Sequence, residues 1–292
     1  MSTKIKKNNK GYYRLPIFII CIVVGFVSLL FVIISPKSGK QIVYEAPLST
    51  AIKIDELPNA QYEIPQRLDK QNEQIIEHIA YSVSYNHDWN LPNWVAYELT
   101  NDELYGNVER SNHFTPDPLV YGDPVVTQDY TRSGYDRGHM APAADMKWSE
   151  QAMRESFYMT NICPQNQNLN RGDWNDLEEL ARDWARKYGN LYIACGPLVS
   201  QDYRTIGQNK KIAIPDAFFK VFLRQTDTSW TAIGFVMPNQ AGNRPLMTYM
   251  MSIDEVEELS GIDFFYNLPD DMEYNVEKEF SVRAWNINVK RK

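Results

Sequence analysis

The most informative segment of this 292-residue sequence reads Tyr135-Asp136-Arg137-Gly138-His139-Met140-Ala141-Pro142-Ala143-Ala144-Asp145-Met146. The imidazole of His139, with an unperturbed pKa of about 6.5, suits proton abstraction at neutral pH. The guanidinium of Arg137 can donate two hydrogen bonds to a phosphate, and Gly138 lets the backbone approach a neighbour closely. Because short motifs match by accident, a buried histidine bonded to a backbone carbonyl, beside a surface arginine, is the alternative.

A second polar segment leads into a helix that begins near Trp174. It reads Thr160-Asn161-Ile162-Cys163-Pro164-Gln165-Asn166-Gln167-Asn168-Leu169-Asn170-Arg171-Gly172-Asp173-Trp174-Asn175-Asp176-Leu177-Glu178. If the helix already includes Asn170, Glu178 lies about 80° from it around the axis. The amide and carboxylate oxygens can then hold one hydrated Mg²⁺. The alternatives are a helix cap at Asn170 and an ordinary ion pair between Glu178 and Arg182, one turn later.

The apolar pattern mixes strands and helices within one globular unit. Short apolar runs predict strands, whereas apolar residues at helical spacing and a capping box of Ser252 and Glu255 predict helices. The expected strands cover residues 94–99, 157–162, 191–194 and a hairpin within 219–237, and the expected helices cover 174–188 and 252–261. Strands and helices do not alternate regularly, so an α+β fold fits better than a doubly wound sheet.

Together these segments resemble the DNA/RNA non-specific endonuclease family, of the endonuclease G type. Several separated strings match that family in the same order, and the resemblance covers most of residues 62–292. The strings are 136–146, Asn161 with Pro164-Gln165, Leu169-Asn170-Arg171-Gly172-x-Trp174-Asn175-x-Leu177-Glu178 and, more weakly, 93–99 and 195–198. The resemblance implies a ββα-metal (His-Me finger) nuclease fold, with a central, mainly antiparallel sheet flanked by helices.

The resemblance also implies roles for individual residues. His139 resembles the general base, and Asn170 resembles the single protein ligand of Mg²⁺, with Mn²⁺ as an alternative ion. Glu178 resembles the residue that orients the waters of the metal. The other matching positions resemble three phosphate-binding arginines, Arg110, Arg137 and Arg182, and an active-site hydrogen-bonding residue, Asn161.

The implied reaction is hydrolysis of phosphodiester bonds in DNA and RNA. In that reaction His139 takes a proton from water, the metal neutralises charge on the phosphate and the leaving 3′ oxygen, and the products carry 5′ phosphates. A site that grips phosphate without reading base edges is largely indifferent to sequence. A phosphodiesterase for other diesters and a catalytically silent nucleic-acid-binding protein are the alternatives. The presence of both His139 and Asn170 favours an active enzyme over the silent one.

The charge of the chain is unevenly distributed. Seven of its 30 basic residues and none of its 37 acidic residues lie in residues 1–40, so residues 41–292 carry 23 against 37 and a net charge of −14. This argues against a protein held to nucleic acid by a broad basic surface. A nuclease must therefore place its positive charge locally, at the scissile phosphate.

An apolar stretch near the N-terminus predicts a membrane anchor. Residues 17–34 contain no charge, and the stretch extends to residues 15–35, long enough to cross a bilayer as a helix. The expected plan is a cytoplasmic basic tail (1–14), a transmembrane helix (15–35), a linker (36–60) and a nuclease domain (61–292). Basic residues before the stretch place the N-terminus in the cytoplasm. The protein is then expected to be single-pass, with its nuclease domain extracytoplasmic, periplasmic or on the cell surface in a bacterium. A cleaved signal peptide is the alternative.

Two cysteines follow apolar runs in the globular region. Cys163 and Cys195 could form a disulfide in an oxidising compartment, or they could be two buried free thiols. The sequence leaves both open, and it indicates no oligomeric state.

Overall fold

The computed structural model describes residues 19–24, 28–33, 42–45, 60–68 and 72–287. The chain divides into two compact units, residues 1–59 and 60–292. The described strands of the first unit form one antiparallel sheet, in the order β1-β2-β3. Their bounds are β1 (Ile19–Val24), β2 (Ser28–Ile33) and β3 (Ile42–Glu45).

The helix predicted across residues 15–35 is wrong for the part of that stretch that the structure describes. Residues 19–24 and 28–33 are strands paired with each other. Five of the six residues of β1 are Ile or Val, and such β-branched side chains favour extended backbone over helix. Among the helices that the structure describes, none combines the length and the apolar character needed to cross a membrane. The rest of the predicted tail and span lies outside the described residues.

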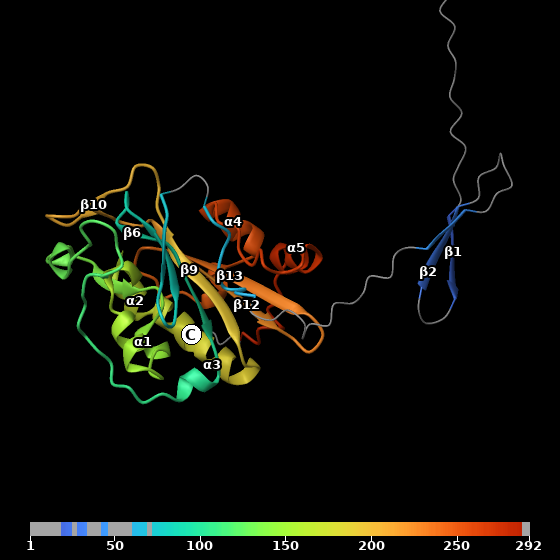
Figure 1. Cartoon of the computed structure of the whole chain (residues 1–292), viewed down its shortest axis with the longest axis horizontal. Coiled ribbons are helices and arrows are strands. Elements are labelled where there is room, and N and C mark those ends of the chain that lie inside the picture. Colours follow the sequence, from blue (N-terminus) through green and yellow to red (C-terminus); the bar gives the residue numbers. More distant parts are fainter. Residues whose placement is uncertain (1–18, 25–27, 34–41, 46–59, 69–71, 288–292) are drawn as a thin grey trace, which may run out of the picture. The chain divides into compact units, whose positions relative to one another are not determined.

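A seven-stranded antiparallel sheet forms the centre of the second unit (Figure 1). Its strands lie in the order β14-β13-β12-β9-β6-β5-β4. Their bounds are β4 (Gln74–Glu77), β5 (Ser82–Asn86), β6 (Leu91–Leu99), β9 (Leu191–Leu198), β12 (Ala217–Gln225), β13 (Trp230–Pro238) and β14 (Met250–Met251). β12 and β13 form the predicted hairpin, with Val221 opposite Gly234. The predicted α+β class and antiparallel sheet are confirmed.

The helices of this unit are short apart from one. They are α1 (Glu150–Glu155), α2 (Gln167–Arg171), α3 (Asp173–Tyr188), α4 (Ile253–Ser260) and α5 (Asp270–Lys278). Short 3₁₀ turns and one further strand pair, β10 (Thr205–Ile206) with β11 (Ile212–Ala213), connect the main elements. The capping box predicted for α4 is present: Ser252 Oγ accepts from Glu255 N, and Glu255 Oε2 accepts from Ser252 N.

Helices cover both faces of the sheet, because its central strands are apolar on both sides. Successive side chains of a strand point to opposite faces. Phe222 of β12 packs against Trp184 of α3, with 5.3 Å between ring centroids. Phe219 points the other way and packs at 5.4 Å against Phe264, in the segment between α4 and α5. In Figure 1, α4 and α5 accordingly lie on the opposite side of the sheet from α3.

A second strand pair carries the most informative segment of the sequence. β7 (Asp136–His139) pairs antiparallel with β8 (Ile162–Gln165), so that His139 lies opposite Ile162. The chain continues from β8 into α2 and α3. The strand predicted at residues 157–162 is wrong before Ile162: a turn and a 3₁₀ helix (Met159–Asn161) precede β8. The cause is Asn161, whose side chain donates to the carbonyl of Ser156 and holds the chain in the turn.

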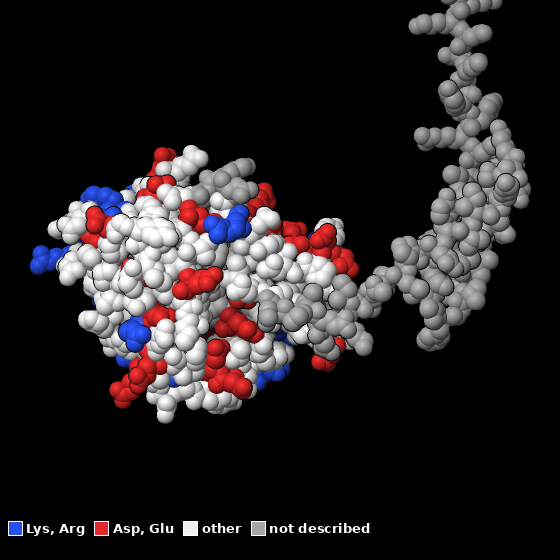
Figure 2. Space-filling model, in the orientation of Figure 1, with Lys and Arg blue, Asp and Glu red and all other residues white. Residues whose placement is uncertain are grey.

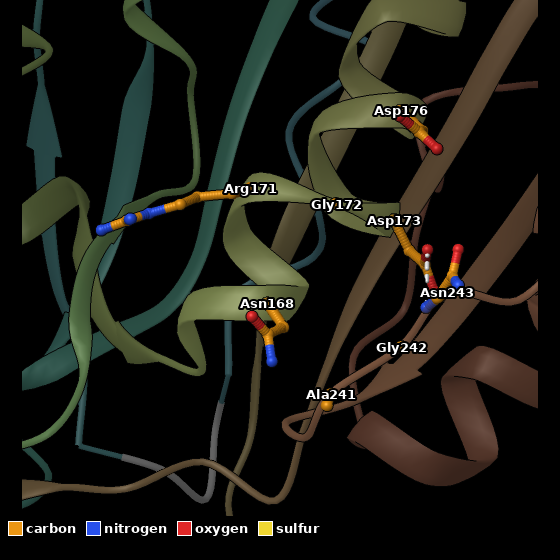
Figure 3. A pocket seen from close by; sticks show the side chains of 8 residues that line it. All are labelled: Asn168, Arg171, Gly172, Asp173, Asp176, Ala241, Gly242 and Asn243. Atoms are coloured by element: carbon orange, nitrogen blue, oxygen red, sulfur yellow. Dashed lines mark hydrogen bonds between the residues drawn. The ribbon is translucent and has the colours of Figure 1, made fainter.

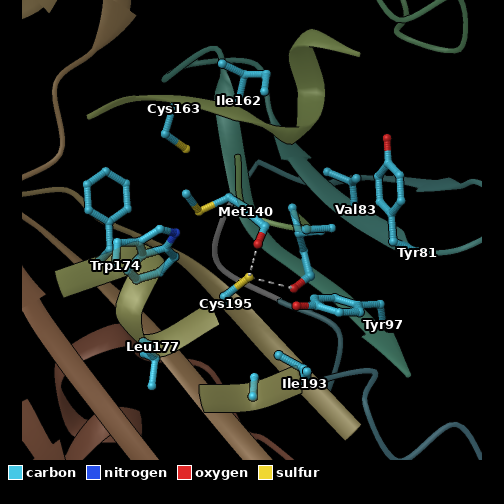
Figure 4. Packing of buried hydrophobic residues seen from close by; sticks show 14 of the residues in the cluster. Tyr81, Val83, Tyr97, Met140, Ile162, Cys163, Trp174, Leu177, Ile193 and Cys195 are labelled. Atoms are coloured by element: carbon cyan, nitrogen blue, oxygen red, sulfur yellow. Dashed lines mark hydrogen bonds between the residues drawn. The ribbon is translucent and has the colours of Figure 1, made fainter. Parts of the chain in front are cut away.

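The two cysteines of the globular unit are free thiols buried in the core, which decides between the two alternatives. Cys195 in β9 donates to the carbonyl oxygens of Met140 (3.3 Å) and Val95 (3.6 Å) (Figure 4). Met140 directly follows His139. The core therefore fixes the backbone on which the histidine is carried.

Candidate active site

One pocket collects six of the seven residues to which the sequence assigns a role. Its volume is about 320 Å³. It is lined by Arg110, Arg137, His139, Pro142, Ala143, Ala144, Asn170, Arg171, Asn175, Glu178 and Arg182. These residues come from β7, α2, α3 and the loops between elements, so the fold brings together segments that are far apart in the sequence. Asn161 is the one predicted residue that lies elsewhere.

Gly138 sets the close packing of the β7–β8 pair beneath the pocket. A Cβ at this position would lie 2.1 Å from Oε1 and 2.7 Å from Cβ of the fully buried Gln165. No side chain fits there, which gives the glycine of the motif a physical reason. The carbonyl oxygen of His139 accepts a hydrogen bond from Trp174 Nε1 at 3.3 Å, and this bond ties β7 to α3.

His139 lies in an enclosed, mainly aromatic setting. Its side chain packs between the rings of Phe114 and Phe157, at centroid distances of 5.4 and 4.8 Å, and the residue is only 8% exposed. Its Nε2 is buried and has no hydrogen-bond partner among the described residues. Burial, followed by the charges of Arg110 and Arg137, lowers the pKa of His139 to about 3. The imidazole is therefore neutral at neutral pH and has a free lone pair.

The same two phenylalanines support the two arginines. The guanidinium of Arg137 lies 4.3 Å from the Phe114 ring centroid, and that of Arg110 lies 5.4 Å from the Phe157 centroid. Stacking on a ring leaves the N–H edge of a guanidinium available for an anion. Neither arginine forms an ion pair with a carboxylate of the described residues. The pocket thus carries uncompensated positive charge within an acidic protein.

Asn170 lines the pocket and does not cap a helix. It lies inside α2, whose cap is Asn166, while α3 begins after Gly172 without a side-chain cap. The Asn170 Nδ2 donates to Asp136 Oδ2 at 3.1 Å, and Arg171 also pairs with that carboxylate. The amide oxygen of Asn170 has no donor among the described residues. The helix-cap alternative is therefore not what the structure contains.

Glu178 lies half-buried in the pocket, and the surface ion pair considered for it is absent. Arg182 pairs instead with the buried Asp145, at 2.9 Å. Burial raises the pKa of Glu178 to about 7, and the charge of Asp145 adds to the rise, while Lys220, Arg182 and Arg110 oppose it. The Glu178 carboxylate and the Asn170 amide oxygen are both oxygen donors of residues that line this pocket. Such hard oxygen donors fit a hydrated Mg²⁺ or Mn²⁺.

Lys220 is a buried cation behind the pocket that the sequence analysis missed. It is 1% exposed, its Nζ donates to the carbonyl oxygen of Met140 at 3.3 Å, and it lies 4.5 Å from the Trp174 ring centroid. Its charge is the largest influence that keeps the pKa of Glu178 from rising further. The sequence feature that indicates Lys220 is a single lysine within the apolar run of β12.

Asn161 acts on the backbone behind the pocket. Its side chain is fully buried, accepts from the N–H of Ala141 and donates to the carbonyl oxygens of Ala141 and Ser156, each at 2.8 Å. Ala141 lies two positions after His139. Asn161 is thus a hydrogen-bonding residue, as expected, but its partners are main-chain atoms and it does not line the pocket.

A neighbouring pocket of about 470 Å³ lies at the junction of α2 and α3 (Figure 3). Its buried Asp173 accepts from the backbone N–H groups of Asn243 and Arg244 and from the Tyr249 hydroxyl. In Figure 3 the side chain of Arg171 extends away from Asp173 and Asn243. Asp173 therefore fastens the loop after β13 to the start of α3, which holds the helix that carries Glu178.

A neutral imidazole, arginines without carboxylate partners and hard oxygen donors are functional groups that suit hydrolysis of a phosphodiester. The family model for DNA/RNA non-specific endonucleases matches residues 59–271. The mitochondrial nuclease EXOG of Danio rerio is 37% identical over 203 residues, covering 63% of this chain and 58% of that protein. The mitochondrial endonuclease G of Homo sapiens is 35% identical over 190 residues, covering 60% and 64%. This chain belongs to the DNA/RNA non-specific endonuclease family, so the predicted family and enzyme class are confirmed.

Solved structures agree with this assignment. A chain of the crystal structure of the EndoG/EndoGI complex, titled for the mechanism of EndoG inhibition, is similar with a TM-score of 0.65 and 31% identity. The similarity covers 73% of this chain and 91% of that chain. This chain spans less than two thirds of the length of the curated relatives described above.

The relatives correct the predicted localisation. They carry the names of mitochondrial nucleases. The prediction of a single-pass membrane protein with a periplasmic or cell-surface nuclease domain is therefore wrong. The expected attachment to a membrane through residues 15–35 is likewise unsupported.

Proposed function

We propose that this protein is a metal-dependent endonuclease that hydrolyses DNA and RNA with little regard for sequence, through a nuclease domain of residues 61–292. The observation that carries the proposal is a single pocket in which a neutral, enclosed imidazole lies beside two arginines without carboxylate partners. Arginines without carboxylate partners can bind an anionic substrate, and a phosphodiester is such an anion. The family match supports DNA and RNA as its source.

Arg110 and Arg137 are proposed to bind the scissile phosphate. Contact with Phe157 and Phe114 holds both guanidinium groups in place before substrate binds. The arginine side chains therefore lose little conformational entropy on binding. Their charges also contribute to the low pKa of His139. A bound phosphate opposes those charges and raises the pKa of the imidazole, which becomes a stronger base once substrate is present.

His139 is proposed as the general base. Because it is neutral in the free pocket, it can accept a proton from the water that attacks phosphorus. The flanking rings and the bond from Trp174 to its carbonyl oxygen hold it in one orientation. Asn161 fixes the next turn of backbone. Positioning of this kind supplies much of the rate in reactions of bound groups.

Asn170 and Glu178 are proposed to hold a hydrated Mg²⁺, with Asn170 as the direct ligand and Glu178 orienting the waters. Asp136 accepts from Asn170 Nδ2 and so directs the amide oxygen toward the metal position. Arg182, held by Asp145, is proposed to add a third positive charge near the phosphate. When bound, the ion supplies Lewis-acid stabilisation of charge on the phosphate and the leaving oxygen.

The test is a cleavage assay of the full chain on supercoiled plasmid, single-stranded DNA, RNA and a small chromogenic diester, each with and without Mg²⁺. We expect cleavage of all three nucleic acids, loss on chelation and recovery with Mg²⁺ or Mn²⁺. Asn170→Ala should lose activity, whereas Asn168→Ala, an exposed residue of the same helix outside this pocket, is the matched control. Cleavage of the small diester alone would point to other substrates, and binding without cleavage would point to a silent binding protein.

A further inference from the structure

Five carboxylates gather where α4 and α5 meet, on the face of the sheet opposite α3. They are Asp254 and Glu257 of α4, Asp263 of the connecting segment, and Glu273 and Glu277 of α5. They form two overlapping groups of three that share Glu277, and within each group carboxylate oxygens lie within 4.8 Å of one another. Figure 2 shows acidic side chains concentrated over this part of the molecule.

Glu277 distinguishes this cluster from an ordinary acidic surface. The residue is only 8% exposed, and its Oε1 is buried with no hydrogen-bond partner among the described residues. An ionised carboxylate in that position is costly unless a proton or a cation accompanies it. In the protein alone, burial and the charges of Glu257 and Glu273 raise the pKa of Glu277 to about 9.

The other members of the cluster lack positive partners as well. No Lys, Arg or His of the described residues forms an ion pair with any of the five. Burial raises the pKa of Glu257 to about 7, although its Oε1 accepts the N–H of Phe264 at 2.8 Å. The surroundings of Glu257 and Glu277 thus disfavour the charged forms of both carboxyl groups. The buried Oε1 of Glu277 accepts no hydrogen bond from the described residues.

We propose that these five residues form a second divalent-cation site, of the kind that binds Ca²⁺, separate from the catalytic pocket, in which one group of three supplies the direct ligands and the other two carboxylates hold waters of the ion. Ca²⁺ takes six to eight oxygens at about 2.4 Å in adaptable geometry, so ligands on opposite sides of the ion lie about 4.8 Å apart. Mg²⁺ demands shorter distances and a stricter octahedron, and it keeps most of its waters. A carboxylate cluster drawn from two helices and a loop suits the larger ion.

The role of the site is structural. The carboxylates come from α4, α5 and the segment between them, which contributes Phe264 to the core beneath β12. A bound cation links α4, α5 and the segment between them. It replaces the repulsion among their carboxylates by attraction of each carboxylate to the cation. It therefore stabilises the C-terminal part of the nuclease domain without contact to the reacting phosphate.

The experiment compares thermal midpoints of the metal-stripped full chain at pH 7.5 with added Ca²⁺ or Mg²⁺. At Ca²⁺ a hundredfold above its Kd, we expect the midpoint to rise by about 5–10 °C, and by less with Mg²⁺. Glu277→Gln should abolish the rise. This variant should still fold, because the amide has almost the same size as the carboxyl group and adds no charge to the cluster. Glu258→Gln, an exposed carboxylate on α4 outside the cluster, should keep the rise.

A further variant separates this site from the catalytic pocket. Asn170→Ala removes the proposed catalytic ligand and should leave the Ca²⁺-dependent rise intact, whatever the enzyme cleaves. Calorimetric titration of Asn170→Ala with Ca²⁺ should then find one site, which disappears when Glu277→Gln is added. An equal rise in the wild type and in Glu277→Gln, no rise in the wild type, or loss of the rise in Asn170→Ala would each overturn the proposal.

Discussion

Replacement of His139 by alanine is the sharpest test of the proposed base. A positioned general base typically contributes about 10²–10⁴-fold in rate, which corresponds to roughly 3–5 kcal/mol of transition-state stabilisation. Among the residues that line the pocket, Glu178 of α3 is the one other side chain that could accept a proton in place of His139. We therefore expect the rate of plasmid cleavage by His139→Ala to fall by at least about 10²-fold.

The packing of the ring predicts a change in stability as well. Removing a buried side chain of this size leaves a cavity and costs about 2–5 kcal/mol. Because Nε2 has no partner among the described residues, its removal also relieves an unsatisfied buried atom, worth about 1–3 kcal/mol. With the middle of each range, the net loss is roughly 1.5 kcal/mol, or a thermal midpoint lower by about 3–6 °C. The variant should thus remain folded at 25 °C.

Cleavage rate and thermal midpoint must be measured on one preparation, because both are expected to fall. The control is Phe264→Leu, which loosens buried packing on the opposite face of the sheet and should lower the midpoint with less than about tenfold loss in rate. Added imidazole can enter the cavity and should restore part of the activity of His139→Ala. If folded His139→Ala cleaves plasmid at the wild-type rate, His139 is only a core residue and the mechanism is refuted.

Three further predictions follow from the same geometry. Asn170→Ala should lower cleavage by about 10²-fold at limiting Mg²⁺ and recover in part at high Mg²⁺; a metal titration that matches the wild type would contradict the assigned ligand. Gly138→Ala should lower the free energy of unfolding by about 1–3 kcal/mol through overpacking against Gln165, and trimming Gln165 to Ala in the same chain should recover part of it in urea titrations. Because the pKa of His139 is lowered to about 3 from 6.5, only the unfolded chain takes up this proton as the pH falls below 6.5. Stability should therefore drop between pH 6.5 and 3 by up to about 5 kcal/mol, and His139→Gln in metal-free buffer should show a shallower drop.

The sequence predicted the pocket well because its chemistry is local. Arg137 and His139 lie on one short strand, and Asn170 and Glu178 lie at neighbouring turns of the α2–α3 segment, so motif spacing already relates them. The hairpin of β12 and β13 and the capped helix α4 were predictable for the same reason. Each depends on a period or a cap contained within a dozen residues or so.

The parts that the sequence did not reveal depend on packing between distant segments. Phe114 and Phe157 pack against the imidazole and the arginines. Phe114 is a single apolar residue in an irregular segment, and the apolar run that begins at Phe157 carries no signal that relates it to His139. Lys220 lies behind the pocket on the central sheet, where only the strand register places it beside Met140. The apolar stretch at 15–35 misled for another reason: hydropathy measures apolar character and does not distinguish a helix from paired strands rich in Ile and Val.

The contrast between an acidic protein and a basic pocket has a kinetic consequence. Residues 41–292 carry a charge of −14, so the outer surface repels nucleic acid and contributes little to binding. In the proposed function, attraction comes from Arg110, Arg137 and Arg182, which act together at one phosphate. With so few contacts, affinity depends weakly on salt, because each phosphate contact adds about −0.9 to the slope of log K against log salt. An enzyme of this kind holds its substrate mainly at the scissile phosphate, and once that bond is cut little remains to retain the product. If the proposed function holds, fast release and low sequence preference have one physical origin, the confinement of positive charge to the place where the chemistry occurs.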